Sequence, residues 1–79
     1  MPKTTLYVVI PFIRNGFEEL WGEEPIAKTS KAEALALGLQ LSQEKVGVIV
    51  FSRAGDVATG EYDDGVILQR WGETPEELF

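Results

Sequence analysis

Cysteine and histidine are both absent from the 79 residues of this chain. Without cysteine there is neither a disulfide framework nor a thiolate ligand for a metal ion. Without histidine the chain lacks the commonest general base, the commonest metal ligand and the side chain that titrates near neutral pH. We therefore expect a protein that is not an enzyme and that uses no cofactor.

Positive charge is scarce. Seven Lys and Arg residues stand against 13 acidic residues, which gives a formal net charge of −6. Recognition of a phosphate backbone needs basic residues that cluster, whereas these are scattered along the chain. We expect neither nucleic acid nor an anionic membrane surface as a partner. The basic residues are Lys3, Arg14, Lys28, Lys31, Lys45, Arg53 and Arg70.

Long apolar runs are also missing. The run at residues 6–13 is far too short to cross a bilayer, and no small-residue cleavage site follows it. We therefore predict a cytoplasmic protein. The length corresponds to a single domain, residues 1–79, and so short a chain buries only about 60–65% of its unfolded surface. A partner or an oligomer would add to its stability.

Most of the predicted strands are rich in β-branched and aromatic residues. Pro11 cannot donate a hydrogen bond, so we expect it near the end of the first strand or on an edge. Residues 17–29 are interrupted by Gly22 and Pro25 and predict a short second strand paired with the first, then an irregular connection. The other strands are predicted at residues 5–13, 46–52 and 66–71, with turns at 14–16 and 53–56 and a polar, glycine-punctuated loop at 57–65.

The clearest local signal is a helix at residues 31–44. Ser30 is a good N-cap, and Glu33 completes a capping box with it. Most of the residues that follow are strong helix formers, and Gly47 marks the end. Thr74 and Pro75 in the short tail, residues 72–79, predict one further helical turn. The fold class is therefore α+β, a two-layer ββαββ arrangement with one helix packed on a small, largely antiparallel sheet.

Alternation along these strands places apolar side chains on both faces of the sheet. A single helix about 21 Å long covers only one face, and monomers rarely expose so large an apolar patch. We predict that another copy of the chain covers the second face, most simply in a two-fold dimer. The alternative is that residues 17–29 and the tail fold over it. The candidate interface residues assigned to that face are Tyr7, Val9, Ile49, Phe51, Ile67 and Trp71, together with Trp21.

The two tryptophans have two equally weighted interpretations. Tryptophan dominates the hot spots of protein interfaces, but in a small protein it also fills the core. The basic residues Lys28, Lys31 and Arg53 form a candidate anion site near the start of the helix. Four carboxylates, Asp56, Glu61, Asp63 and Asp64, lie close in sequence, but the EF-hand spacing is absent. We interpret them as a solvated acidic loop.

Several short segments resemble a family of small bacterial domains of unknown function with a strand–strand–helix–strand–strand order. They are Tyr7-Val8-Val9-x-Pro11, Thr29-x-Lys31-Ala32-Glu33-Ala34, Val48-x-Val50, Gly65-Val66-Ile67 and Arg70-Trp71-Gly72. The chain departs from the family pattern at Gly16-Phe17, where Gly-Trp is usual, and in a longer loop at residues 55–64. The resemblance implies the order of the elements and brings no activity with it.

Together these observations predict a small non-catalytic protein-interaction module that associates with itself. The alternative is a protein that binds a small ligand or an anion, or an enzyme whose site forms across a dimer. A concave pocket with convergent polar groups would favour this alternative.

Overall fold

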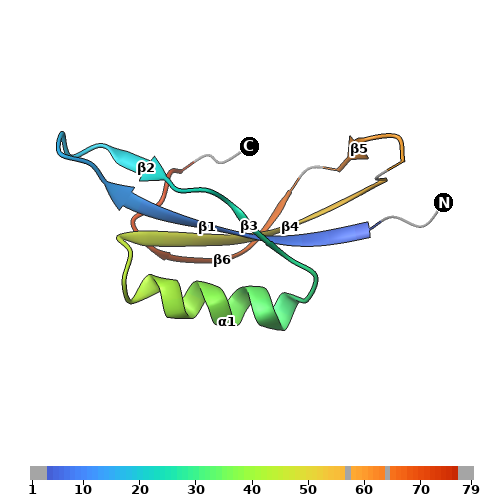
Figure 1. Cartoon of the computed structure of the whole chain (residues 1–79), viewed down its shortest axis with the longest axis horizontal. Coiled ribbons are helices and arrows are strands. Elements are labelled where there is room, and N and C mark those ends of the chain that lie inside the picture. The colour runs from blue at the N-terminus through green and yellow to red at the C-terminus, as the bar shows by residue number, and fades with distance from the viewer. Residues whose placement is uncertain (1–3, 57, 64, 77–79) are drawn as a thin grey trace.

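The computed structural model describes residues 4–56, 58–63 and 65–76. Figure 1 shows an α+β fold in which one helix lies along one face of an antiparallel sheet. The central strands are β1 (Thr4–Arg14) and β4 (Gly47–Asp56), which pair from Thr4↔Gly55 to Phe12↔Gly47. Both are rich in valine and isoleucine, which favour extended backbone.

Two short strands line each edge of this central pair. On one side β2 (Leu20–Gly22) and β3 (Ile26–Lys28) pair with β1, and on the other β5 (Glu61–Tyr62) and β6 (Val66–Gly72) pair with β4. The predicted second strand is therefore confirmed. The predicted irregular connection after it is confirmed only at residues 23–25, because residues 26–28 form β3 along the same edge.

Pro11 lies at the break between β2 and β3. Val9 pairs with Ile26 and Phe12 pairs with Gly22, so residues 10–11 of β1 face the three residues 23–25. The extra residue bends this edge, as a β-bulge does. Pro11 has no N–H to offer there, but its carbonyl accepts a hydrogen bond from the Glu23 amide at 2.8 Å. The expectation that Pro11 lies on an edge is wrong, because β1 is a central strand with β4 on its other side, where Pro11 pairs with Val48. The break between β2 and β3 lets proline occupy this central position.

The predicted turn at residues 53–56 is wrong. These residues belong to β4, in which Arg53 pairs with Leu6 and Gly55 pairs with Thr4. The long first strand supplies partners for residues 53–55, and β5 supplies Glu61 as the partner of Asp56. This pairing outweighs the local turn preference of the glycine and the aspartate. The chain turns only after Asp56, where the amide of Gly60 donates to the Asp56 carbonyl.

The helix α1 (Lys31–Ser42) begins where the sequence predicts and ends two residues earlier. The Ser30 hydroxyl accepts a hydrogen bond from the Glu33 amide, which confirms the N-cap. Only Ala34 and Gly38 are buried in the helix, and this pair of small residues, one turn apart, lets it approach the sheet closely. A Cβ atom on Gly38 would lie 2.5 Å from Cζ3 of Trp71 and 2.7 Å from Cγ2 of Val50.

Apolar side chains form a separate cluster on each face of the sheet. Between helix and sheet the buried residues are Val9, Ala34, Val48 and Val50, and on the opposite face they are Phe12, Ile49 and Phe51. The prediction that both faces are apolar is confirmed. None of the helices described is long and apolar enough to cross a membrane.

The tail leaves β6 through Gly72, whose φ of 66° is left-handed and therefore favours glycine. The Glu73 amide then donates to the Val46 carbonyl at 3.0 Å, and the chain turns back. Residues 73–76 are not helical. The rest of the predicted helical turn, residues 77–79, lies outside the described residues.

Candidate binding surface

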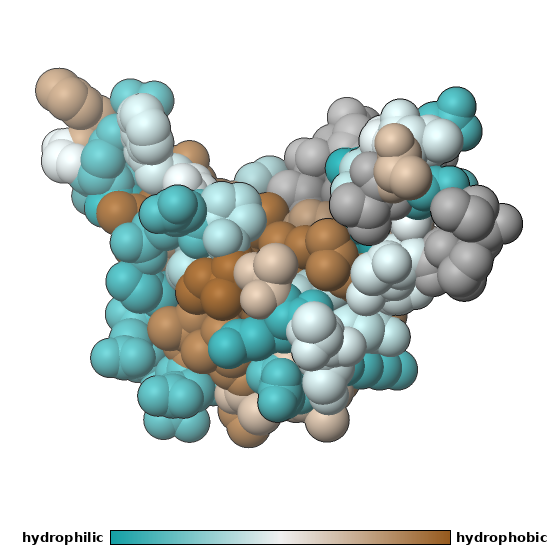
Figure 2. Space-filling view, turned by 45° about the vertical axis from the view of Figure 1, so that its right-hand side comes forward, coloured by the Kyte–Doolittle hydropathy of each residue, from teal (hydrophilic) through white to brown (hydrophobic). Residues whose placement is uncertain are grey.

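The sheet face opposite the helix is hollowed. The β1–β2 end and the β4–β5 end both rise away from the helix (Figure 1), and Figure 2 shows apolar side chains in the depression between the two raised ends. We call this surface the concave face. We call its buried residues, Phe12, Ile49 and Phe51, the centre, and the half-buried residues packed against them, Val8, Ile10, Leu20 and Ile67, the rim.

The side chains of the rim are only half-buried, whereas the three side chains at the centre of the concave face are buried. Leu20 reaches the face from β2, so part of the 17–29 segment does contribute cover. Residues 73–76 of the tail turn back toward the same face, as the ribbon shows (Figure 1). The sheet therefore carries a second apolar surface that the described residues cover at its centre and leave partly open at its rim.

All three arginines of the chain lie on the concave face. Arg14 follows Phe12 by two residues in β1, Arg70 pairs with Ile49, and Arg53 pairs with Leu6. Pairing and alternation place each on the side of Phe12, Ile49 and Phe51. Basic residues that are far apart in the sequence are thus collected on one apolar face of an acidic protein.

Arg14 holds the start of the tail. Its Nη2 and Nε atoms donate to the two carboxylate oxygens of Glu73 at 2.9 and 3.1 Å, a bidentate pair. The hydrogen bond and the charge of Arg14 lower the pKa of the Glu73 carboxyl below its usual range, and Glu73 in turn raises the pKa of Arg14. Both side chains are exposed, so this pair orients the tail and adds little to stability.

Arg70 contacts the next part of the tail through neutral groups. Its guanidinium donates to the carbonyl oxygens of Pro75 and Glu76, each at 3.2 Å. No carboxylate among the described residues pairs with Arg70, and the Glu76 side chain likewise has no cation beside it there. Arg70 on the concave face and the exposed residue Glu76 next to it are therefore each left without an ionic partner among the described residues.

The structure divides the predicted interface residues between the two faces. Ile49, Phe51 and Ile67 lie together on the concave face, but Tyr7, Val9 and Trp71 belong to the helix-side cluster. The assignment of Tyr7 and Val9 was wrong because Val9 pairs with Val50, a helix-side residue. The assignment of Trp71 was wrong because a bulge near Val50 adds one residue to β6 and reverses the alternation beyond it.

The burial of individual side chains removes further residues from the predicted interface. Val9 and Ile49 have no exposed surface, so neither reaches a partner in this arrangement. Trp71 is half-buried and packs against the helix-side core near Gly38, whereas Trp21 in β2 remains 56% exposed. The core interpretation therefore holds for Trp71, and Trp21 stays a candidate contact outside the concave face.

The basic residues of the predicted anion site are not brought together. Lys28 pairs with Tyr7 and so lies on the helix side, while Arg53 lies on the concave face. Of the acidic loop, Asp64 lies outside the described residues. The Asp56 carboxylate accepts a hydrogen bond from the Ala58 amide, and the described part of the chain contains no group of three carboxylates able to hold a metal ion.

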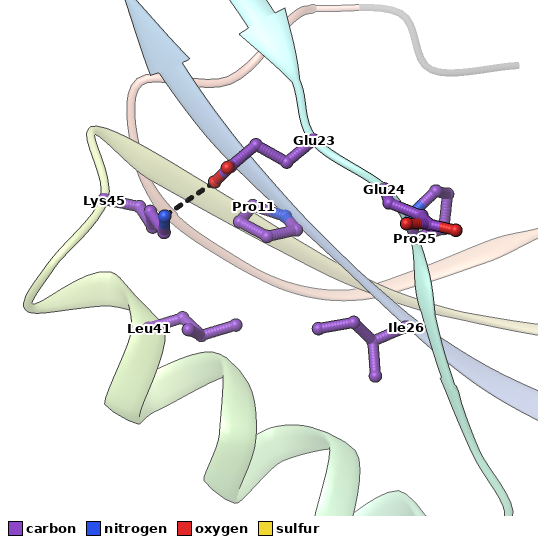
Figure 3. A pocket seen from close by; sticks show the side chains of 7 residues that line it. All are labelled: Pro11, Glu23, Glu24, Pro25, Ile26, Leu41 and Lys45. Atoms are coloured by element: carbon purple, nitrogen blue, oxygen red, sulfur yellow. Dashed lines mark ion pairs between the residues drawn. The ribbon is translucent and has the colours of Figure 1, made fainter.

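A separate open groove lies between the end of the helix and the bend in the β2–β3 edge (Figure 3). Its volume is about 460 Å³, and an ion pair of 2.8 Å between Lys45 Nζ and Glu23 Oε1 stands at one side. Pro11 and Leu41 contribute apolar walls. The sequence did not predict this groove, because it depends on the bulge at residues 23–25. The lining residues are Pro11, Glu23, Glu24, Pro25, Ile26, Leu41 and Lys45.

The sequence analysis did not identify the rim residues Val8, Ile10 and Leu20. It also did not predict that the three arginines lie on one face. Alternation did group Val8 with Ile10, but it did not show which face the helix takes. A comparison of the chain with family models, curated proteins and solved structures gave no match. The resemblance to the strand–strand–helix–strand–strand family stays a prediction.

Proposed function

We propose that the protein is a non-catalytic protein-interaction module that associates with itself through the concave face. The observation that carries this proposal is the half-exposed apolar rim of that face, which lies beside arginines and tail carboxylates on a sheet whose other face is already covered by a helix. Burial of apolar surface drives association, at roughly 25 cal/mol per Å² before the cost of association is subtracted. A two-fold dimer is the simplest closed form.

We include in this proposal the finer topology of the sheet and the location of the protein in the cell. We treat β2 with β3 as one bent edge strand and β5 with β6 as the other, which gives a two-layer ββαββ unit. We place the protein in the cytoplasm, without nucleic acid, membrane or cofactor as partners.

Sedimentation velocity tests the self-association. We expect a species of twice the 8.8 kDa chain mass at concentrations of tens of micromolar or below. Ile67→Glu puts a charge on the rim, where Ile67 is half-buried, and should shift the protein to monomer. Leu39→Glu is the matched control, because Leu39 is 53% exposed on the helix and lies away from the concave face. A wild-type chain that stays at 8.8 kDa at several hundred micromolar would rule out self-association.

The groove beside the helix supports a second candidate function, the binding of a small ligand. Its volume lies in the range of ligand sites, and its apolar walls stand beside both a carboxylate and an ammonium group. A ligand with an apolar body and a charged end would suit it. A small-molecule library followed by amide chemical shifts tests this. Shifts that cluster at Glu23, Leu41 and Lys45 would support the candidate, and the absence of any such cluster would remove it.

A further inference from the structure

β6 places Arg70 on the concave face, and the tail brings the exposed residue Glu76 against its guanidinium. Arg70 lies on the edge strand β6, opposite Ile49, and its guanidinium contacts the backbone of residues 75 and 76. Its partners there are neutral carbonyl oxygens. The Glu76 carboxylate, in the same stretch of chain, has no cation among the described residues.

A two-fold interface requires this kind of self-complementarity. In such an interface residue i of one copy contacts residue j of the other, and j contacts i in return. A surface that carries a cation and an anion close together, both without an ionic partner, meets this requirement. Arg70 on the concave face and Glu76 in the tail segment that it contacts form such a combination, next to an apolar rim that gains from burial.

We propose that reciprocal ion pairs between Arg70 of one copy and Glu76 of the second copy align the dimer across the concave face. This inference rests on the proposed self-association and adds which residues of the two copies lie opposite each other. Arg14 and Glu73 do not take part across the interface, because they already pair within one chain at 2.9 Å. The occupant of the concave face is thus a second copy of this chain, with its own tail at the contact.

Charge exchange between two full-length variants tests the pairing. In Arg70→Glu each copy presents two carboxylates at the contact, and in Glu76→Arg each presents two cations. Each variant alone should lose about tenfold or more in dimer affinity, since like charges are then opposed. Mixed together, they should form a heterodimer near wild-type affinity, because both pairs are again complementary. Native mass spectrometry separates the three dimers by mass.

A double variant and two control variants complete the test. The double variant Arg70→Glu/Glu76→Arg should dimerise with itself as the wild type does. Arg14→Glu and Glu73→Arg are the matched controls for a pair within one chain, and mixing them should give no preference for a heterodimer.

Failure of the ion pairs and failure of self-association give different results. A wild-type chain that remains monomeric overturns both. A wild-type dimer whose Arg70→Glu and Glu76→Arg variants mix only statistically, or keep wild-type affinity, overturns the ion pairs and leaves self-association standing. Preferential heterodimers in the Arg14 and Glu73 controls would show that the tail contacts the second copy through Glu73 instead.

Discussion

Gly38 is the residue at which the helix comes closest to the sheet. The space that a side chain would occupy there is filled by the Trp71 ring and by Val50. This explains how a half-buried tryptophan on an edge strand can pack under a helix that is rich in leucine. The contact depends on the absence of a single methyl group.

Gly38→Ala should therefore destabilise the protein, although alanine is the better helix former. The gain in helix propensity is about 1 kcal/mol, whereas overpacking costs typically 1–3 kcal/mol. We expect a net loss of about 1 kcal/mol in the free energy of unfolding, measured by urea denaturation. Gly16→Ala is the control, since no atom lies within 4 Å of its added Cβ and its effect should stay within about 0.5 kcal/mol. A Gly38→Ala protein more stable than wild type would contradict the packing shown here.

The Glu73 carboxyl should titrate below the ordinary glutamate range, because Arg14 hydrogen-bonds to its charged form. A pKa that is lowered in the folded state adds stability above the unfolded-state value, about 4.3 for glutamate. This contribution is lost as the pH falls through the lowered folded-state value. Carbon-detected NMR titration measures it directly. In Arg14→Gln the pKa of Glu73 should return toward the ordinary value, and an unchanged titration would show that the pair does not form.

At the scale of elements, the helix depends on its first turn. The Ser30 hydroxyl accepts from the Glu33 amide at 3.4 Å, which is long for a hydrogen bond. Ser30→Ala should cost about 0.5–1 kcal/mol of unfolding free energy, at the low end of the range for N-caps. Ser30→Asp keeps an acceptor at the cap and should restore the loss. If both variants lose the same stability, the capping bond is not responsible.

The elements that the sequence predicts well are those with strong local signals. Ser30, Glu33 and the alanines and leucines after them define the helix, and runs of β-branched residues define β1, β4 and β6. The prediction was wrong at residues 53–56 because a turn preference is local, whereas the pairing of Arg53 with Leu6 is formed by a distant strand. β3 was missed because three residues carry little periodicity of their own.

The candidate surface was harder to predict than the fold. Sequence alternation correctly gave two apolar sets of residues in each strand. It could not match the sets between strands, because the register that pairs Val9 with Val50 is set by tertiary structure. The bulge in β6 then reversed the side on which Trp71 lies. To predict that the three arginines lie on one face requires both the register of the strands and the position of the bulge in β6. Neither can be read from the local sequence.

At the scale of the whole molecule, stability should be greatest in the central pair β1–β4. Val48, Ile49 and Val50 have no exposed surface and lie between strands on both sides. Hydrogen exchange should be slowest for the amides of this pair and faster by about two orders of magnitude or more for β5, which contributes only Glu61 and Tyr62 to the sheet. Equal protection in β5 and β4 would mean that the two strands open only together.

The left-handed turn at Gly72 has a practical consequence for handling this protein. Because the chain reverses there and heads back over the hollow of the sheet, any affinity tag or reporter fused after residue 76 would start beside Arg70. Such a fusion would crowd the concave face. A reporter joined ahead of Thr4 starts from the far end of β1, at the opposite end of that strand from Arg14, and is the better choice for assays of assembly.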